Sequence, residues 1–247
     1  MKKLLILLLA IFLSAGSLSA QSVDIKKLLQ QAKQGDAKAQ STLGGIAVLT
    51  EDSVGAVKWF RLAADQGEVR AQFLLGKMYS NGEGVPQDYA QAVKWYRLAA
   101  DQGLASAQFH LGLMYDNGQG VPQEDYVQAA KWYRLAANKG DASAQYYLAF
   151  KYKKGQGVSQ SYEQAANWFR LAADQGYASA QFSLGAAYLF GQGVSEDEIQ
   201  ALVWMIRAAD QGDVNALKSR EFIELTMTPQ QIAQVQELAR NWKPKKQ

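Results

Sequence analysis

The sequence contains no cysteine and only one histidine among its 247 residues. Without cysteine there is no disulfide framework, no thiol nucleophile and no cysteine for lipid attachment. A zinc site would have to rest mostly on carboxylates, and no cluster with the spacing of metal ligands occurs. We therefore expect no metal, no cofactor and no catalytic residue. The histidine, His110, is interpreted as a surface residue rather than a catalytic base.

The sequence also lacks a long apolar segment. Its most apolar run, Leu4–Leu13, has ten residues, whereas a membrane-spanning helix needs about 20. Two lysines precede this run and small residues follow it, which is typical of a secretory signal peptide. We predict that residues 1–20 are removed on export. The mature chain is then expected in the periplasm, with secretion as the alternative, and without a membrane span.

Neither sign of charge dominates the chain. Loss of Lys2 and Lys3 with the signal peptide lowers the number of basic residues from 26 to 24, against 23 acidic residues. A basic cluster at Lys243–Lys246 is interpreted as a solvated terminus. This balance argues against nucleic acid or an anionic membrane as the partner.

The sequence is instead periodic, because a short motif recurs at a regular spacing. The heptad RLAADQG occurs three times, and near copies of it occur twice more. Each copy follows a tryptophan, and the tryptophans lie 36 or 37 residues apart, at Trp59, Trp95, Trp132, Trp168 and Trp204. Self-similarity at a fixed period of this length predicts a solenoid of stacked repeats.

Each period contains two amphipathic helices. In the first, Ala71, Leu75 and Tyr79 lie four residues apart and share one face. The second begins at a short polar residue, found seven residues before each tryptophan at Asp52, Asp88, Asp125, Ser161 and Asp197. In the last four copies a glutamine follows three residues later, which predicts a capping box. The tryptophans and the alanines around them are expected to form the core.

Glycine-rich loops such as NGEGVPQ, at Asn81–Gln87, separate the two helices. A loop that cradles phosphate is the alternative interpretation. It is disfavoured because the loop follows a helix rather than a strand and occurs four times. We interpret these glycines as helix ends and tight turns.

The recurring pattern ASAQFxLGxMYxxGxGVPQ, followed by YxxAxKWYRLAADQG, resembles the Sel-one-like repeat family, whose α/α solenoids are related to tetratricopeptide repeats. The resemblance implies an adaptor that holds a protein partner, with envelope or host-interaction roles in secreted bacterial members. Cysteine-rich members have been associated with penicillin binding or β-lactamase activity through one disulfide per repeat. This chain has no cysteine.

The period and the resemblance together predict an all-α fold, a right-handed α/α superhelical solenoid of about five helix-turn-helix repeats with a C-terminal capping helix pair. Residues 21–35 are expected to form an N-terminal capping helix. The repeats are divided as residues 36–67, 68–103, 104–140, 141–176 and 177–212. Residues 213–247 are expected to form the C-terminal cap and the basic tail, with an N-cap at Thr228.

Function is expected where the repeats differ from one another. One stripe of each first helix varies, and helical geometry directs it away from the Ala/Leu/Tyr face. Since first helices line the concave side of a solenoid, we predict a partner-binding groove there. Its residues are Arg70, Leu74, Lys77, Asn81, His110, Leu113, Asn117, Tyr147, Phe150, Lys154, Ser183 and Phe190. The alternative is that these positions are exposed and unconstrained.

These patterns favour an exported, monomeric scaffold that binds a protein or peptide and is not an enzyme. Two alternatives stay open. One is an enzyme of cell-wall or β-lactam chemistry, which only the resemblance suggests. The other is a protein that binds peptidoglycan or other cell-wall material, since exposed aromatic rings can stack on sugars.

Overall fold

The computed structural model describes residues 25–225 and 227–244, and within them it contains thirteen α-helices and no strand. The all-α helix-turn-helix solenoid that the sequence predicts is confirmed. The helices form two compact units, an N-terminal unit that ends at Leu104 and a C-terminal unit that begins at Ala105. The predicted signal peptide, residues 1–20, lies outside the described residues.

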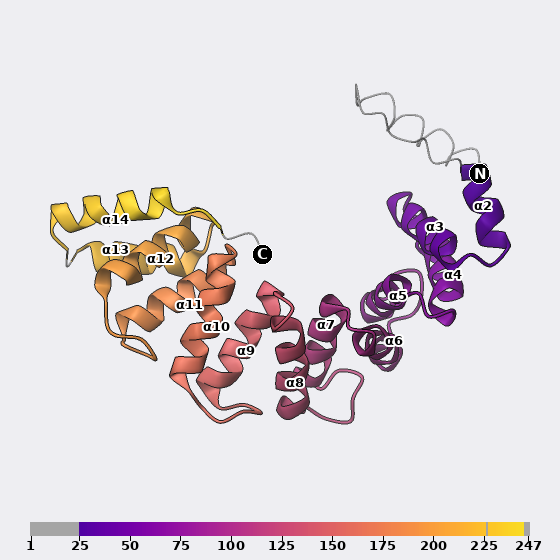
Figure 1. Ribbon diagram of the computed structural model, residues 1–247, viewed down its shortest axis with the longest axis horizontal. Helices are drawn as coiled ribbons and strands as arrows, with labels where there is room; N and C mark the ends of the chain where they lie inside the picture. Colours follow the sequence, from indigo (N-terminus) through magenta and orange to yellow (C-terminus); the bar gives the residue numbers. More distant parts are fainter. Residues whose placement is uncertain (1–24, 226, 245–247) are drawn as a thin grey trace, which may run out of the picture. The chain divides into compact units, whose positions relative to one another are not determined.

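First and second helices alternate along each unit (Figure 1). The N-terminal unit contains α2 (Ile25–Lys33), α3 (Ala37–Leu49), α4 (Ser53–Asp65), α5 (Val69–Asn81) and α6 (Tyr89–Asp101). The C-terminal unit contains α7 (Ala105–Asp116), α8 (Tyr126–Ala137), α9 (Ala142–Lys154), α10 (Tyr162–Asp174), α11 (Ala178–Leu189), α12 (Glu198–Asp210), α13 (Val214–Glu224) and α14 (Pro229–Asn241). Within a unit, each first helix of a complete repeat packs on the second helix of its own repeat and on the second helix that precedes it.

The predicted N-caps of the second helices are present. Asp88, for example, accepts a hydrogen bond from the backbone N–H of Gln91, and Ser161 accepts one from Gln164. The reciprocal hydrogen bond, from the N-cap backbone N–H to the glutamine side chain, would complete a capping box. Among the described helices it is formed only at α14, from Thr228 to Gln231. The aspartates therefore cap the second helices alone, and the expected capping box is wrong for them.

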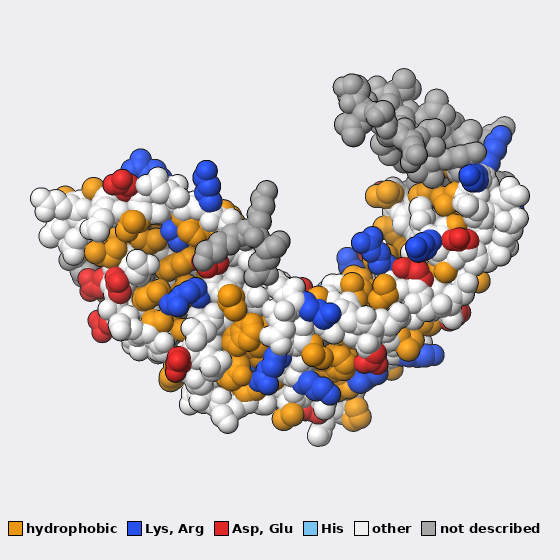
Figure 2. All heavy atoms as spheres, in the orientation of Figure 1, with side chains coloured by type: hydrophobic (Ala, Val, Ile, Leu, Met, Phe, Trp, Pro, Cys, Tyr) orange, Lys and Arg blue, Asp and Glu red, His pale blue; other side chains and the backbone are white. Residues whose placement is uncertain are grey.

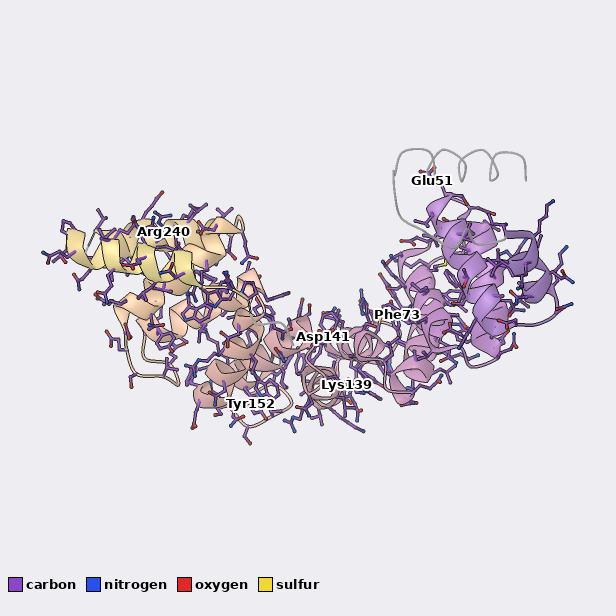
Figure 3. The ribbon with its side chains drawn as sticks, turned by 45° about the horizontal axis from the view of Figure 1, so that its top comes forward. Glu51, Phe73, Lys139, Asp141, Tyr152 and Arg240 are labelled. Carbon is purple, nitrogen blue, oxygen red and sulfur yellow. The ribbon has the colours of Figure 1, made fainter. Side chains whose placement is uncertain are left out.

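The two glycines of each GxGV loop have different structural roles. Gly82 ends α5 in the left-handed region, with φ of 74°. Gly84 lies against the start of α4 in the preceding repeat, where an added Cβ would come within 2.3 Å of the Ser53 carbonyl oxygen. The first repeat has no such loop, and Glu51 takes the left-handed conformation instead, with φ of 60° (Figure 3). A side chain in that region costs about 1–2 kcal/mol relative to glycine.

The core of the first four repeats is an aromatic ring packed on a small residue, and in the fifth repeat Met205 takes the place of the ring. Tyr96 of α6 is fully buried, and its ring lies so close to Gly76 of α5 that an added Cβ would be 2.7 Å from it. Tyr133 of α8 covers Gly112 in the same way. The repeat tryptophans precede these rings, and Trp95, Trp132 and Trp204 are buried while the other two are half-buried. The core role predicted for the tryptophans is shared with the residue after each of them.

In the first, second, fourth and fifth repeats, a buried glutamine joins three helices. Gln72 of α5 donates to the carbonyl oxygen of Ala64 in the preceding repeat, at 3.2 Å, and accepts a hydrogen bond from Gln102 at the end of α6, at 2.7 Å. Gln145 and Gln181 bind in the same way, to a carbonyl eight residues earlier and to a glutamine thirty residues later. The glutamine of RLAADQG is therefore the donor that satisfies a buried amide.

The arginine of the same heptad also reaches the next repeat. The Arg170 guanidinium donates to the phenol oxygen of Tyr188 at 2.9 Å, and Arg134 donates to Tyr152 at 2.8 Å. Each guanidinium also lies over the ring of its tyrosine, at 5.9 and 5.7 Å from the centroid. The heptad arginine of these two repeats therefore bonds to a phenol of the next first helix.

The C-terminal helix α14 packs on α12, so it closes the stack beside α13 rather than on top of it. The guanidinium of Arg207 lies against two indole rings, 4.4 Å from the centroid of Trp204 and 4.7 Å from that of Trp242. It also donates to the Leu238 carbonyl oxygen at 3.3 Å. Burial lowers the pKa of Arg207 to about 10, against the opposing effect of Asp174. Among the described residues, no helix is both long enough and apolar enough to cross a bilayer.

The glutamine contact can be tested by substitution at the heptad glutamine, because the third repeat has Lys139 where the others have glutamine. Gln175→Asn should lower the free energy of unfolding by about 1–3 kcal/mol, since it withdraws the donor from the buried Gln145. Lys139→Gln, which supplies the donor that the other repeats have, should raise it by about 0.5–1.5 kcal/mol. Urea unfolding followed by circular dichroism measures both. Two variants with the wild-type midpoint would contradict this account.

Candidate binding surface

The exposed side of the first helices, here called the first-helix face, carries a cleft in the N-terminal unit. Its volume is about 490 Å³, and helices α3 and α5 of two successive repeats enclose it. Its lining residues are Lys38, Ser41, Thr42, Glu68, Arg70 and Leu74. Arg70 and Leu74 belong to the predicted groove, so this part of the predicted stripe lies at a concave site.

The chemistry of this cleft favours a negatively charged group. Lys38 and Arg70 are both exposed cations. The carboxylate of Glu68 is engaged at the start of α5, where it accepts hydrogen bonds from the backbone N–H groups of Arg70 and Ala71, at 3.2 and 2.5 Å. Its charge is therefore directed at the helix N-terminus. The two cations remain available to a carboxylate of a partner.

In the C-terminal unit the same face carries a run of aromatic rings, here called the aromatic row. It is made up of Phe109, Tyr147, Tyr146, Phe150 and Tyr177. Neighbouring rings lie between 5.0 and 5.5 Å apart, centroid to centroid, and all five are half-buried. Figure 2 shows hydrophobic side chains gathered where Figure 1 draws α9, the helix that supplies three of these residues.

The structure corrects the expected exposure of the predicted groove. Arg70, Lys77, Asn81, Asn117 and Lys154 are exposed, and so is Phe190, at 66%. Half-buried positions are Leu74, His110, Leu113, Tyr147, Phe150 and Ser183. A helix in a solenoid has neighbours on two sides, whereas a helical wheel for one helix assigns a single buried face. Tyr147 therefore packs against Phe109 of the preceding repeat, and Phe150 against Phe169 of its own repeat.

The lone histidine has a structural role. A ring nitrogen of His110, Nδ1, lies 2.8 Å from the carbonyl oxygen of Ser106, one turn earlier in α7. The ring also stands edge-on to Phe109, with centroids 5.4 Å apart. Within the described part of the chain, no group of three histidine, aspartate or glutamate side chains is placed to hold a metal ion.

Several residues of this face were not predicted from the sequence. Phe109, Tyr146 and Tyr177 belong to the aromatic row, and Lys38 lines the cleft. A signal for the first two was present, because one position of the first helix is aromatic in four repeats, at Phe73, Phe109, Tyr146 and Phe182. Those rings were not distinguished from the core. Nothing in the sequence pairs Lys38 with Arg70.

A buried ion pair lies beside the aromatic row. The ammonium of Lys151 in α9 donates to the carboxylate of Asp116 at the end of α7, and both side chains are almost fully shielded from water. Tyr133 donates to the other carboxylate oxygen at 3.1 Å, and the ammonium lies 4.5 Å from the ring centroid of Tyr126. Burial and the neighbouring carboxylate raise the pKa of Tyr133 far above its ordinary value. The second and fifth repeats have Met78 and Ala187 at the position of Lys151.

Comparison with protein families gives one match. The model described as Sel1 repeat matches five consecutive segments, at residues 42–68, 69–104, 105–141, 142–177 and 178–213. Together these segments cover more than half of the chain. Comparison with curated proteins finds no match.

Solved structures of the same repeat class are similar. A Sel1 repeat protein from Oxalobacter formigenes is 28% identical, with a TM-score of 0.72, over 90% of this chain and 98% of that one. A protective antigen present in uropathogenic Escherichia coli strains, which displays an SLR fold, is 34% identical with a TM-score of 0.63. That match covers 89% of this chain and 56% of the antigen, so this chain spans about half of the antigen's length.

The buried ion pair between Asp116 and Lys151 predicts that removing one charge destabilises the protein more than removing both. Lys151→Met alone should cost about 3–5 kcal/mol, because it leaves the Asp116 carboxylate buried without its cation. Adding Asp116→Ser, so that both positions carry the residues found at Met78 and Ser80, should recover most of that loss. Urea midpoints of the two variants measure this. A double variant no more stable than the single one would show that the charge is not the cause.

Proposed function

The chain belongs to the Sel1 repeat family, and on that premise we propose that it is an exported scaffold that binds a protein or peptide on its first-helix face. The family resemblance that the sequence indicated is confirmed by the five matching segments. Proteins of this family are generally scaffolds for protein interactions rather than enzymes. The partner, the site and the location in the bacterial envelope are parts of the proposal.

The observation that carries the proposal is the cleft between α3 and α5. It brings together two cations, Lys38 and Arg70, from successive repeats beside the apolar side chain of Leu74. Such a site suits a peptide that presents a carboxylate next to an apolar residue. Lys77 and Asn81 are also exposed on α5, further along the helix from Arg70, so they extend the polar surface on which a peptide would lie.

The aromatic row offers a second contact of a different kind. Its rings are already packed on one another, so little side-chain entropy is lost when a partner covers their exposed edges. Aromatic side chains in such a setting are typical anchors of protein interfaces. We expect apolar side chains of the partner to bind there. Export to the envelope is supported by the N-terminal sequence pattern, and one similar structure is that of a bacterial protective antigen.

The proposal is tested by affinity capture from an envelope extract, with the chain from Gln21 onward as bait. The variant Lys38→Glu/Arg70→Glu should lose the retained protein, with affinity for it falling by about tenfold or more. Both side chains are exposed, and a glutamate at position 70 stands in the first turn of α5, where negative charge is tolerated. The variant should therefore keep the helical circular dichroism of the wild type.

The matched control is Lys58→Glu/Lys139→Glu, which makes the same change in net charge at exposed sites outside the cleft. It should retain the protein as the wild type does. Equal retention by all three baits would place the site elsewhere. If the wild-type bait captures nothing specific, while purified cell-wall material sediments with it, the protein-scaffold proposal fails in favour of wall binding.

A further inference from the structure

The last first helix, α13, exposes an apolar face. Val214, Leu217, Phe222 and Leu225 are 61%, 41%, 70% and 84% exposed. Ala216 and Ile223 lie on the opposite side of this helix and are buried. Apolar side chains gathered on one face of a helix usually mark a contact surface.

The equivalent face of the preceding first helix is covered. The residue of α11 that corresponds to Leu217 is Gln181, which is fully buried and bonded to Gln211 at the end of α12. The one that corresponds to Glu221 is Gly185, where an added Cβ would lie 2.9 Å from the Cγ of Met205. In the repeats this face therefore receives the second helix. On α13 the glutamine and the glycine are replaced, and α14 packs on α12 instead.

The exposed face of α13 is complementary to itself. For two antiparallel copies of this helix related by a two-fold axis midway between Ser219 and Arg220, Lys218 of one copy lies level with Glu221 of the other. Val214 likewise lies level with Leu225, and Leu217 with Phe222. All six side chains are exposed. Self-complementarity of this kind is what an isologous two-fold interface requires.

We propose that α13 is the contact surface between two copies of this chain, which pair through it as an antiparallel dimer. The second copy supplies the helix that covers the equivalent face in each complete repeat. Lys218 and Glu221 then form two identical ion pairs, which favour the antiparallel arrangement over the parallel one because parallel pairing would place like charges together. This inference departs from the monomer expected from the sequence.

The test is the mass of the purified chain from Gln21 onward, without any partner, measured by sedimentation and light scattering from about 1 μM to about 1 mM, where small interfaces dissociate. The wild type should show a monomer–dimer equilibrium. Lys218→Glu should weaken dimerisation by at least about tenfold, because it opposes acidic side chains across the interface. Lys218→Glu/Glu221→Lys restores opposite charges and should restore the dimer.

Phe222→Ser/Leu225→Ser should abolish the dimer while leaving the fold intact, since both side chains are largely exposed. Lys58→Glu, an exposed charge reversal on α4, is the control and should dimerise as the wild type does. A wild type that stays monomeric over the whole range overturns the proposal. So does a dimer that survives Phe222→Ser/Leu225→Ser, or one that the double charge exchange fails to restore. No partner takes part, so the outcome is independent of capture on the first-helix face.

Discussion

In four of the five repeats, neighbouring helices are held in register by a glutamine amide that is almost completely shielded from water. Burying a glutamine costs several kcal/mol unless both ends of its amide are bonded. The side-chain N–H of Gln145 donates to the Ala137 carbonyl oxygen at the end of the preceding repeat. Its side-chain oxygen accepts a hydrogen bond from Gln175 at the end of its own repeat. Only one relative placement of the three helices satisfies both bonds. Hydrophobic packing of the alanines and the aromatic rings stabilises the contacts between the helices, and the hydrogen bonds of the amide determine their register.

Much of the fold could be predicted from the sequence because its determinants are local. The period of the tryptophans gave the number of repeats, the short polar residues marked the starts of second helices, and the glycines marked helix ends. Features that depend on a neighbouring repeat could not be predicted. No pattern within one helix reveals that Gln102 meets Gln72, or that Arg170 reaches Tyr188. The position of α14 on α12, rather than on α13, is likewise a result of packing.

The candidate site was predicted in part for the same reason. A single helical wheel placed Arg70 and Lys77 on the exposed side correctly, since charged side chains there face water whatever the neighbours are. It misplaced Tyr147 and Phe150, whose rings pack against rings of other helices. The chemistry of the first-helix face therefore differs between the two units. In the N-terminal unit it is a polar cleft, and in the C-terminal unit it is a surface of rings that are already ordered.

The ion pair between Asp116 and Lys151 restricts how the gene can change. Most junctions are built from residues that every repeat carries, so unequal recombination could delete or duplicate one repeat and leave a compatible neighbour on each side. The third and fourth repeats are an exception, because each holds one half of a buried pair. A duplicated fourth repeat placed after itself would bury its ammonium against Lys153, the residue that corresponds to Asp116. These two repeats can therefore be inherited, copied or lost only together.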